Sequence, residues 1–335
     1  MKARIAAVEY ALPKTLLTNE ELSGSHPDWK VKRIAGMTGI ESRHIAAPDE
    51  YTSDLAIAAA RALFDTYNID AKSVDYLILC TQTPDFYLPT TACVVQGELG
   101  MRREVGAIDI TLGCSGYIYA LSLARGLIES KQTESVLVIT AETHSKLANP
   151  DDKSTRPIFG DGATATLVVA DESHSGIGRA SLGTDGSKGQ VLVVPNGGLR
   201  DGGEFSPASR TDDRSLISNG YDMYMDGSEI FNFTLRVVPE CVNNLLEFEG
   251  TTLADIDLFV FHQANGYLIE HLRKKLGVPE EKFVVALREY GNTGSSTIPI
   301  ALVDAIKADR VRPGDKIMLV GFGVGLSWGG VVITW

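Results

Sequence analysis

A thiol, an imidazole and a carboxamide in this sequence could together form a nucleophilic site. Cys114 follows the apolar run AIDITL at a glycine and precedes residues with apolar side chains at helical spacing. Backbone N–H groups at a helix N-terminus favour an anion, so this position should lower the pKa of the thiol. A single cysteine is more often a small apolar residue in a crowded turn, which is how we interpret Cys80, Cys93 and Cys241.

His262 and Asn292 are possible partners for this cysteine. His262 follows the apolar run DLFVF, and Asn292 lies in YGNTG before a second apolar segment. A cysteine near an imidazole and an amide can form a thioester and stabilise a developing oxyanion. Taken alone, a histidine at a strand end is more often a core residue satisfied by backbone groups. The interpretation therefore depends on whether the fold brings the three side chains together.

An internal repeat indicates how they would meet. The segment SVDYLILC resembles DIDLFVFH, GCSG resembles GNTG, and SVLVITAE resembles KIMLVGFG, all at nearly constant spacing. Cys80 then corresponds to His262, and Cys114 to Asn292. This pattern favours an ancient duplication, and two halves packed about a pseudo-twofold axis would place His262 and Asn292 opposite the loop of Cys114.

Each half reads as strand, helix, strand, which favours an α/β fold with similar sheets packed around shared helices. We expect the halves to span residues 1–175 and 176–335. Thr18 is a predicted helix cap within an insertion at residues 18–50. A Gly-, Ser- and Asp-rich stretch at residues 183–221 is either a lid facing the substrate or a disordered excursion.

Composition limits the class of protein. The 335 residues are 44% hydrophobic and carry a net charge of -12, which disfavours nonspecific binding to nucleic acid or an anionic membrane. The chain lacks a signal-like start and an apolar run of roughly 20 residues. Its four cysteines contain no CxxC pair, so we expect neither a disulfide framework nor a metal site. These features predict a cytoplasmic enzyme.

Five motifs carry a resemblance to a known family. DITLGCSGYIYAL, IFGDGATATLV, FVFHQANGYL, YGNTGSSTIP and GFGVGLSWGG resemble the thiolase superfamily and, within it, β-ketoacyl-ACP synthase III of fatty acid biosynthesis. The similarity runs from about residue 3 to the C-terminus. It implies a thiolase-like fold, in which two duplicated α/β halves pack as a five-layered αβαβα sandwich. It also implies a homodimer with the segment FYLPTTACVVQ near the interface.

The resemblance further implies a two-stage Claisen condensation without a cofactor. Cys114 would take an acyl group from acyl-CoA or acyl-ACP, and malonyl-ACP would then lose CO₂ and attack it, giving a 3-oxoacyl-ACP. His262 and Asn292 would donate hydrogen bonds to the malonyl thioester carbonyl. The backbone N–H groups of Cys114 and Val324 would form the oxyanion hole for the acyl-enzyme.

The predicted substrate contacts include departures from the family pattern. Met37 replaces the arginine of the usual TRTGI motif, with two extra residues after Trp29, and Ser228 replaces a common asparagine. Lys153 or Arg156 would have to supply the positive charge for CoA phosphates. The CoA site is therefore altered, which puts acetyl-CoA as first donor in question and favours a specialised acyl pathway.

The acyl pocket and the carrier surface also differ. Phe322 is a further predicted substrate contact, and Leu88 stands where related enzymes often place a phenylalanine from the dimer partner, so longer or branched acyl groups should fit. A usual Leu-Arg pair after HQAN is Gly-Tyr here. An acyl carrier protein, which is acidic, would contact Arg273, Lys274 and Lys275, although such a run is more often a solvated helix face.

Two other functions stay open at this point. An acyltransferase could pass the acyl group from Cys114 to an amine or hydroxyl without decarboxylation. A non-catalytic partner subunit would need no nucleophile, so the intact set of Cys114, His262 and Asn292 counts against it.

Overall fold

A five-stranded sheet forms the first half of the chain. The computed structural model describes residues 2–172, 176–200 and 220–335. The strands lie in the order β1 (Lys2–Ala11), β7 (Gly162–Asp171), β6 (Ser135–Glu142), β4 (Tyr76–Cys80) and β5 (Gly106–Ile110). β4 is parallel to β5 and β6, whereas β7 is antiparallel to β1 and β6. β5 is an edge strand of this sheet.

The second sheet repeats this arrangement with four strands. Its order is β8 (Ser181–Thr184), β13 (Ser327–Thr334), β12 (Lys316–Gly323) and β11 (Leu258–Phe261). The strand directions repeat those of β1, β7, β6 and β4. A parallel bridge between Phe259 and Phe283 lies where β5 would stand. The predicted equivalence of SVDYLILC with DIDLFVFH and of SVLVITAE with KIMLVGFG is thus visible in the topology.

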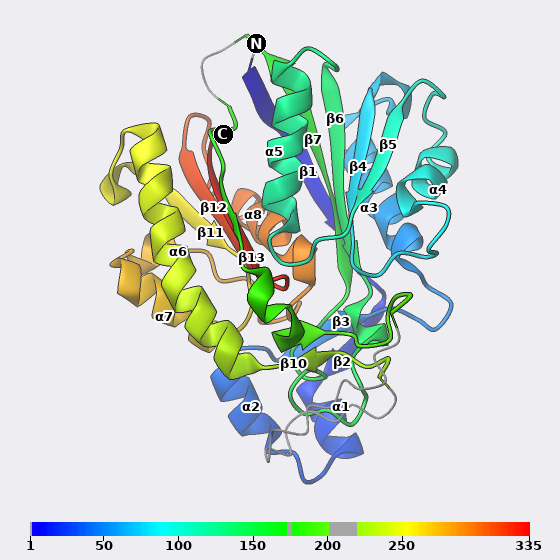
Figure 1. Ribbon diagram of the computed structural model, residues 1–335, viewed down its shortest axis with the longest axis vertical. Coiled ribbons are helices and arrows are strands. Elements are labelled where there is room, and N and C mark those ends of the chain that lie inside the picture. Colours follow the sequence, from blue (N-terminus) through cyan, green and yellow to red (C-terminus); the bar gives the residue numbers. More distant parts are fainter. Residues whose placement is uncertain (1, 173–175, 201–219) are drawn as a thin grey trace.

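Helices separate and cover the two sheets in five layers (Figure 1). α5 (Gly116–Glu129) and α8 (Thr297–Lys307) lie between the sheets, α3 (Thr52–Tyr67) and α4 (Thr91–Glu98) cover the first, and α6 (Gly227–Glu249) and α7 (Gly266–Leu276) cover the second. The αβαβα order matches the prediction. Each sheet draws its strands from one half of the sequence, and the division at residue 175 stays our proposal.

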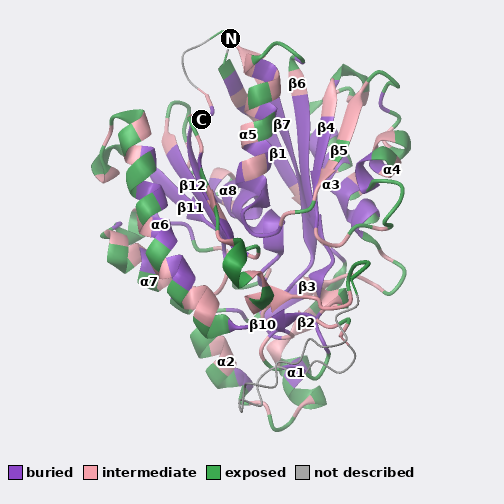
Figure 2. Cartoon of the chain, viewed as in Figure 1, coloured by how far each residue is buried: buried purple, intermediate pink, exposed green. Residues whose placement is uncertain are grey.

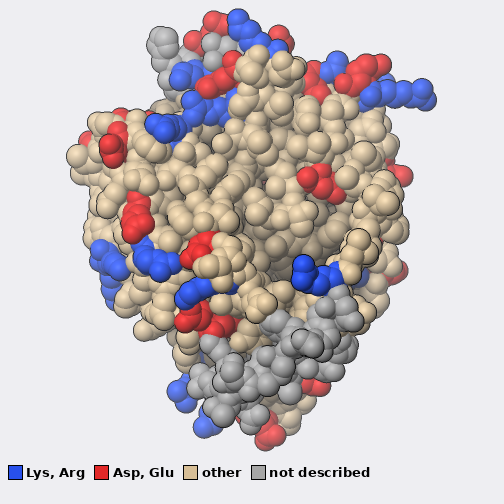
Figure 3. All heavy atoms as spheres, in the orientation of Figure 1, with Lys and Arg blue, Asp and Glu red and all other residues tan. Residues whose placement is uncertain are grey.

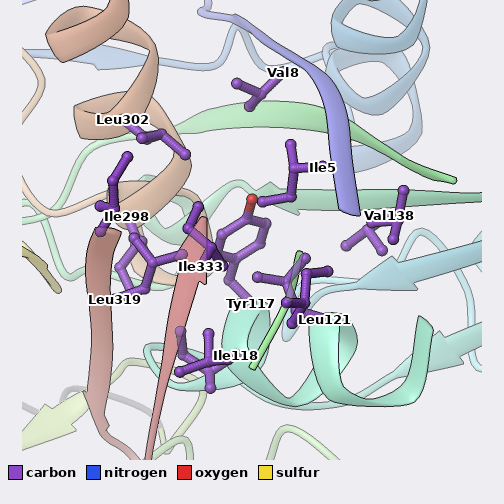
Figure 4. Close-up of a cluster of buried hydrophobic side chains, with 14 of the residues drawn as sticks. Ile5, Val8, Tyr117, Ile118, Leu121, Val138, Ile298, Leu302, Leu319 and Ile333 are labelled. Atoms are coloured by element: carbon purple, nitrogen blue, oxygen red, sulfur yellow. The ribbon is translucent and has the colours of Figure 1, made fainter. Parts of the chain in front are cut away.

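Burial explains this layering. Strands and central helices are largely buried, while the outer helices α6 and α7 alternate buried and exposed residues (Figure 2). Between the sheets, Tyr117 and Leu121 of α5 pack with Ile298 and Leu302 of α8 in one apolar cluster (Figure 4). α5 is therefore apolar around most of its surface, as a helix enclosed by two sheets must be.

Shorter elements gather at the end of the sheets where the site lies. They are β2 (Thr15–Thr18), α1 (Asn19–Ser25), α2 (Val31–Thr38), β3 (Ser42–Ile45), β9 (Leu192–Val193) and β10 (Tyr224–Met225). Short 3-10 segments span Ala71–Ser73, His144–Lys146, Gly186–Val191, which is kinked at Lys188, Leu253–Asp255, Glu280–Lys282 and Gly294–Ser296. Thr18 caps α1 in a reciprocal pair with Glu21, as predicted.

Two further expectations concern the chain as a whole. About half of the stretch at 183–221 interpreted as a lid or a disordered excursion, namely residues 201–219, lies outside the described residues. Among the helices of the described part, none is both long enough and apolar enough to cross a membrane.

Candidate active site

Cys114 lies in the loop between β5 and α5, two residues before the helix begins. The end of β12 packs directly on it: a Cβ atom at Gly323, the last residue of that strand, would lie 2.7 Å from the Cys114 Sγ. A Cβ at Gly113 would lie 2.2 Å from the Gln82 Oε1. At Gly323 a side chain would meet the nucleophile itself, whereas at Gly113 it would meet the side chains of Gln82 and Val324.

Burial dominates the acidity of this thiol. Cys114 is only 6% exposed, and burial raises its pKa to about 12. Backbone hydrogen bonds from the N–H groups of Val324 and Cys114 itself act in the opposite direction, while Glu142 raises the pKa further. The lowering expected from the helix N-terminus is therefore wrong for the free protein, since desolvation of the thiolate exceeds the effect of the N–H groups.

His262 follows β11 directly and is almost completely buried. Its Nδ1 lies 2.6 Å from the Thr297 Oγ1, and the ring of Phe322 packs edge-on at 5.4 Å between ring centroids. Burial, assisted by nearby His144, lowers the pKa of His262 to about 3. The imidazole is therefore neutral near pH 7.

Asn292 is held by both its backbone and its side chain. Its N–H donates to the Ile158 carbonyl at 2.8 Å, and its Oδ1 accepts from the Gly294 N–H at 3.0 Å. With the oxygen occupied in this way, the amide NH₂ is the group left to face a ligand. Gly294 has φ of +59°, a left-handed conformation in which a Cβ would lie 2.4 Å from the His144 Cε1.

One cavity of about 640 Å³ brings the three predicted side chains together. Cys114, His262 and Asn292 all line it, from opposite halves of the chain. Of the predicted substrate contacts, Met37, Ser228 and Phe322 also line it. Predicted positions outside the lining are Trp29, Leu88, Lys153, Arg156 and Val324.

The positions outside the lining have other surroundings. Trp29 stacks on His26 at 4.1 Å between ring centroids. Arg156 is half-buried and donates to the Ser145 carbonyl at 3.4 Å, whereas Lys153 is exposed. Leu88 is 86% exposed. Their assignment to substrate binding stays a prediction.

The predicted carrier contacts on α7 are partly engaged within the chain. Arg273 is largely buried and bonds Glu270 at 2.7 Å and the Val278 carbonyl at 2.9 Å. Lys275 donates to the Leu235 carbonyl at 2.8 Å, whereas Lys274 bonds Glu270 but remains 69% exposed. Lys274 and Lys275 are thus exposed while Arg273 is not, and the role of all three stays a prediction.

Several residues of the site were not predicted. Thr297 contacts His262 although 35 residues separate them, and a buried pair, Glu142 and His144, lies behind the Asn292 turn. Asp226, which caps α6, and Tyr267 also line the cavity. Tyr267 had a signal in the sequence, as a departure from the pattern after HQAN. Within the described residues, no group of three His, Cys, Asp or Glu side chains could hold a metal ion.

The strand order and the repeated halves define a thiolase-like fold. The model of the 3-oxoacyl-[acyl-carrier-protein (ACP)] synthase III family matches residues 108–186, and the model of its C-terminal part matches residues 246–335. A β-ketoacyl-[acyl-carrier-protein] synthase III of Clostridium perfringens is 40% identical over 328 residues, covering 96% of this chain and 95% of that protein.

Solved structures agree with this relationship. A crystal structure of a 3-oxoacyl-(acyl-carrier-protein) synthase III matches with a TM-score of 0.95 and 43% identity, covering 100% of both chains. A 3-oxoacyl-(acyl-carrier protein) synthase from Burkholderia xenovorans matches with a TM-score of 0.93 and 35% identity, covering 100% of this chain and 94% of the other.

The chain belongs to the β-ketoacyl-ACP synthase III family of thiolase-like condensing enzymes, which are acyltransferases. This membership confirms the predicted fold, family and class of enzyme. It favours a catalytic protein over a non-catalytic partner subunit.

Proposed function

We propose that the protein condenses a Cys114-bound acyl group with a malonyl thioester carried by acyl carrier protein. In the first stage Cys114 Sγ attacks the donor thioester, the donor C–S bond breaks, and the thiol proton passes to the departing sulfur. The N–H groups of Cys114 and Val324, which act to lower the pKa of the thiol in the free protein, stabilise the oxyanion of this step.

In the second stage malonyl-ACP loses CO₂, and the electron pair of the broken C–C bond passes to the thioester oxygen as an enolate. The neutral imidazole of His262 and the amide NH₂ of Asn292 donate to that oxygen. The enolate carbon then attacks the acyl-enzyme, forming a C–C bond and releasing Cys114 as a thiolate that takes up a proton. The product is a 3-oxoacyl-ACP.

One observation carries this assignment of roles: three buried side chains from opposite halves line a single cavity. In a site shielded from water, hydrogen-bond donors fixed in advance stabilise developing charge more strongly than they would in solution. His262 is suited to donation rather than to base catalysis, because burial keeps its pKa far below neutral pH.

The test is mass spectrometry of the protein after exposure to a panel of acyl thioesters, followed by malonyl-ACP. We expect acylation at Cys114, and release of CO₂ with a 3-oxoacyl-ACP in the second step. Cys114→Ala is the matched control and should show neither acylation nor condensation. Transfer of the acyl group to an amine or hydroxyl without CO₂ release would overturn the proposal.

The cavity favours a donor other than acetyl-CoA. Its lining within the described residues contains no Lys or Arg and includes Asp226, which is a poor surrounding for the CoA phosphates. We propose a longer or branched acyl donor, as the leucine at 88 also suggests. Faster acylation of Cys114 by acetyl-CoA than by medium-chain thioesters would refute this.

We propose a homodimer that pairs the first sheet of two copies. β5 is an edge strand, and apolar side chains are exposed on and near it: Ile108, Leu123, Phe86, Tyr87 and Leu88. The broad middle of the face in Figure 3 carries few charged side chains. Exposed apolar surface of this kind commonly marks an interface. Light scattering should give a mass twice the 36.1 kDa of one chain. Ile108→Lys should shift the measured mass toward that of a single chain.

A further inference from the structure

A buried carboxyl group joins the two halves of the site from behind. Glu142 ends β6 and has no exposed surface. Its Oε1 accepts from the Ser295 hydroxyl at 2.8 Å, three residues beyond Asn292. Its Oε2 accepts from the Gln82 N–H at 3.0 Å, and the Gln82 side chain packs on Gly113, beside the nucleophile.

The partners of Glu142 provide little compensation for a negative charge. Besides Ser295 and Gln82, they are the hydroxyls of Thr83 and Thr81 at 3.3 and 3.5 Å. All of these groups are uncharged. An ionised carboxylate without a cationic partner is costly to bury, whereas the protonated acid is not.

His144 is the titratable group closest to this carboxyl. Its Nε2 lies 3.5 Å from the Glu142 Oε2, while its buried Nδ1 has no hydrogen-bond partner in the described structure. The ring packs on Gly294, whose N–H fixes the Asn292 carboxamide. The other titratable groups that sense Glu142 are the buried thiols of Cys80 and Cys114.

We propose that Glu142 is a positioning residue that must carry its proton for condensation to occur. As a neutral acid it holds the Asn292 turn of one half and the Cys114 loop of the other in fixed positions relative to each other. Its ionisation at alkaline pH places a negative charge behind a site that must accumulate negative charge on an enolate, and condensation stops. This inference rests on the proposed function.

The acidity of the group agrees with this geometry. Burial raises the pKa of Glu142 to about 8, against the lowering effect of its hydrogen bonds. Burial lowers the pKa of the neighbouring His144 to about 4, so near pH 7 the proton lies on Glu142 and the imidazole is neutral.

The test compares pH profiles of condensation for the wild-type protein and Glu142→Gln, which keeps the size and hydrogen bonding of the neutral acid. We expect wild-type kcat/KM to fall by about tenfold per pH unit above the pKa of Glu142. Glu142→Gln should keep most of the activity at pH 7 and show no such fall. Asp161→Asn, which alters another buried carboxyl with a raised pKa, should retain the fall.

Two results would overturn the inference. One is an alkaline fall that persists in Glu142→Gln. The other is a folded Glu142→Gln that has lost activity at pH 7 by about a hundredfold or more, since the carboxylate charge would then be required. Wild-type turnover at pH 7 tests the proposed function separately.

A second measurement does not depend on turnover. Ionised Glu142 raises the pKa of Cys114, so alkylation of Cys114 by iodoacetamide at pH 9 should be roughly three- to tenfold faster in Glu142→Gln. Equal rates would contradict the inference even if condensation is unaffected.

Discussion

The imidazole Nδ1 of His262 lies 2.6 Å from the hydroxyl oxygen of Thr297, which in turn lies 3.1 Å from the Gly294 carbonyl. A hydroxyl has one proton, so it cannot donate to both neighbours. Donation to Nδ1 leaves a proton on Nε2, the tautomer required to stabilise an enolate. Donation to the carbonyl leaves Nε2 without a proton.

We predict that Thr297→Val slows decarboxylation by about 10- to 100-fold, because the ring loses the partner that fixes its tautomer. Acylation of Cys114 should change little, and Thr297→Ser should restore most of the rate. The measurement is single-turnover CO₂ release from malonyl-ACP. An equal loss in both stages would instead indicate a general packing defect.

Removing either enolate donor should separate the two stages of the reaction. We expect His262→Ala and Asn292→Ala to lower decarboxylation by about 10²- to 10³-fold while self-acylation stays measurable. Mass spectrometry of the acyl-enzyme alongside CO₂ release checks both. If His262→Ala cannot be acylated, the imidazole is the base for the thiol and the proposed roles are wrong.

Iodoacetamide should label the cysteines in an order set by the exposure of each thiol rather than by its role in the reaction. Cys93 is exposed, whereas burial raises the pKa of Cys114 to about 12. At pH 7 we expect Cys93 to react first in the single chain and more slowly where the proposed dimer covers the segment FYLPTTACVVQ, whereas Cys114 should react slowly in both states, because the thiolate is the reactive species. Peptide mapping at several times gives the order, with Cys93→Ser as the control. Faster labelling of Cys114 would show that its thiolate is stabilised in solution.

Stability should depend on pH through three buried groups. Burial lowers the pKa of His262 to about 3 and of His144 to about 4, so the stability they contribute is present above about pH 6.5 and is lost on acidification. Burial raises the pKa of Glu142, so its contribution is present below about pH 4.5 and is lost as the pH rises toward about 8.

Glu142→Gln isolates the last of these effects. Its melting temperature relative to wild type should increase steadily between about pH 4.5 and 8, because only the wild-type protein has a proton to lose on unfolding. Scanning calorimetry at several pH values measures this difference. A difference that is constant with pH would mean that Glu142 is ionised in the folded protein.

Gly323 allows a check on the packing around the nucleophile. A methyl group there would lie 2.7 Å from the Cys114 Sγ, so Gly323→Ala should lower acylation by about 10²-fold or more through displacement of the sulfur. Gly126→Ala, in α5 with open space around it and no left-handed backbone conformation, should leave the acylation rate unchanged. Acyl-enzyme formation followed by mass spectrometry distinguishes the two.

Local patterns in the sequence were sufficient to predict the fold. The apolar runs of β4 and β11 and the glycine-rich breaks before α5 and α8 are short-range signals, and their repetition predicted two similar halves. Thr18 and Glu21 form the helix cap that their spacing indicates. The ion pair between Arg273 and Glu270 could also be predicted from the sequence, because Glu270 lies three residues before Arg273 on the same helix.

The electrostatics of the site could not be predicted in the same way. The acidity of Cys114 depends on burial by Gly323, more than 200 residues away in the chain, and the expectation from the helix N-terminus alone had the wrong sign. Glu142 and His144 lie at the end of an apolar segment whose sequence is typical of an ordinary core strand. Their effect arises only where Ser295 and Gly294, from the other half, pack against them.

The contact between Gly323 and the nucleophile also affects how sequence variants of this enzyme should be classified. A replacement at residue 323 would lower turnover by displacing the Cys114 sulfur although every reacting group is still present, and a screen based on activity alone would count the glycine as part of the chemistry. Proteins of this type in which another residue occupies the position are therefore candidates for lost activity, even when their cysteine, histidine and asparagine are all intact.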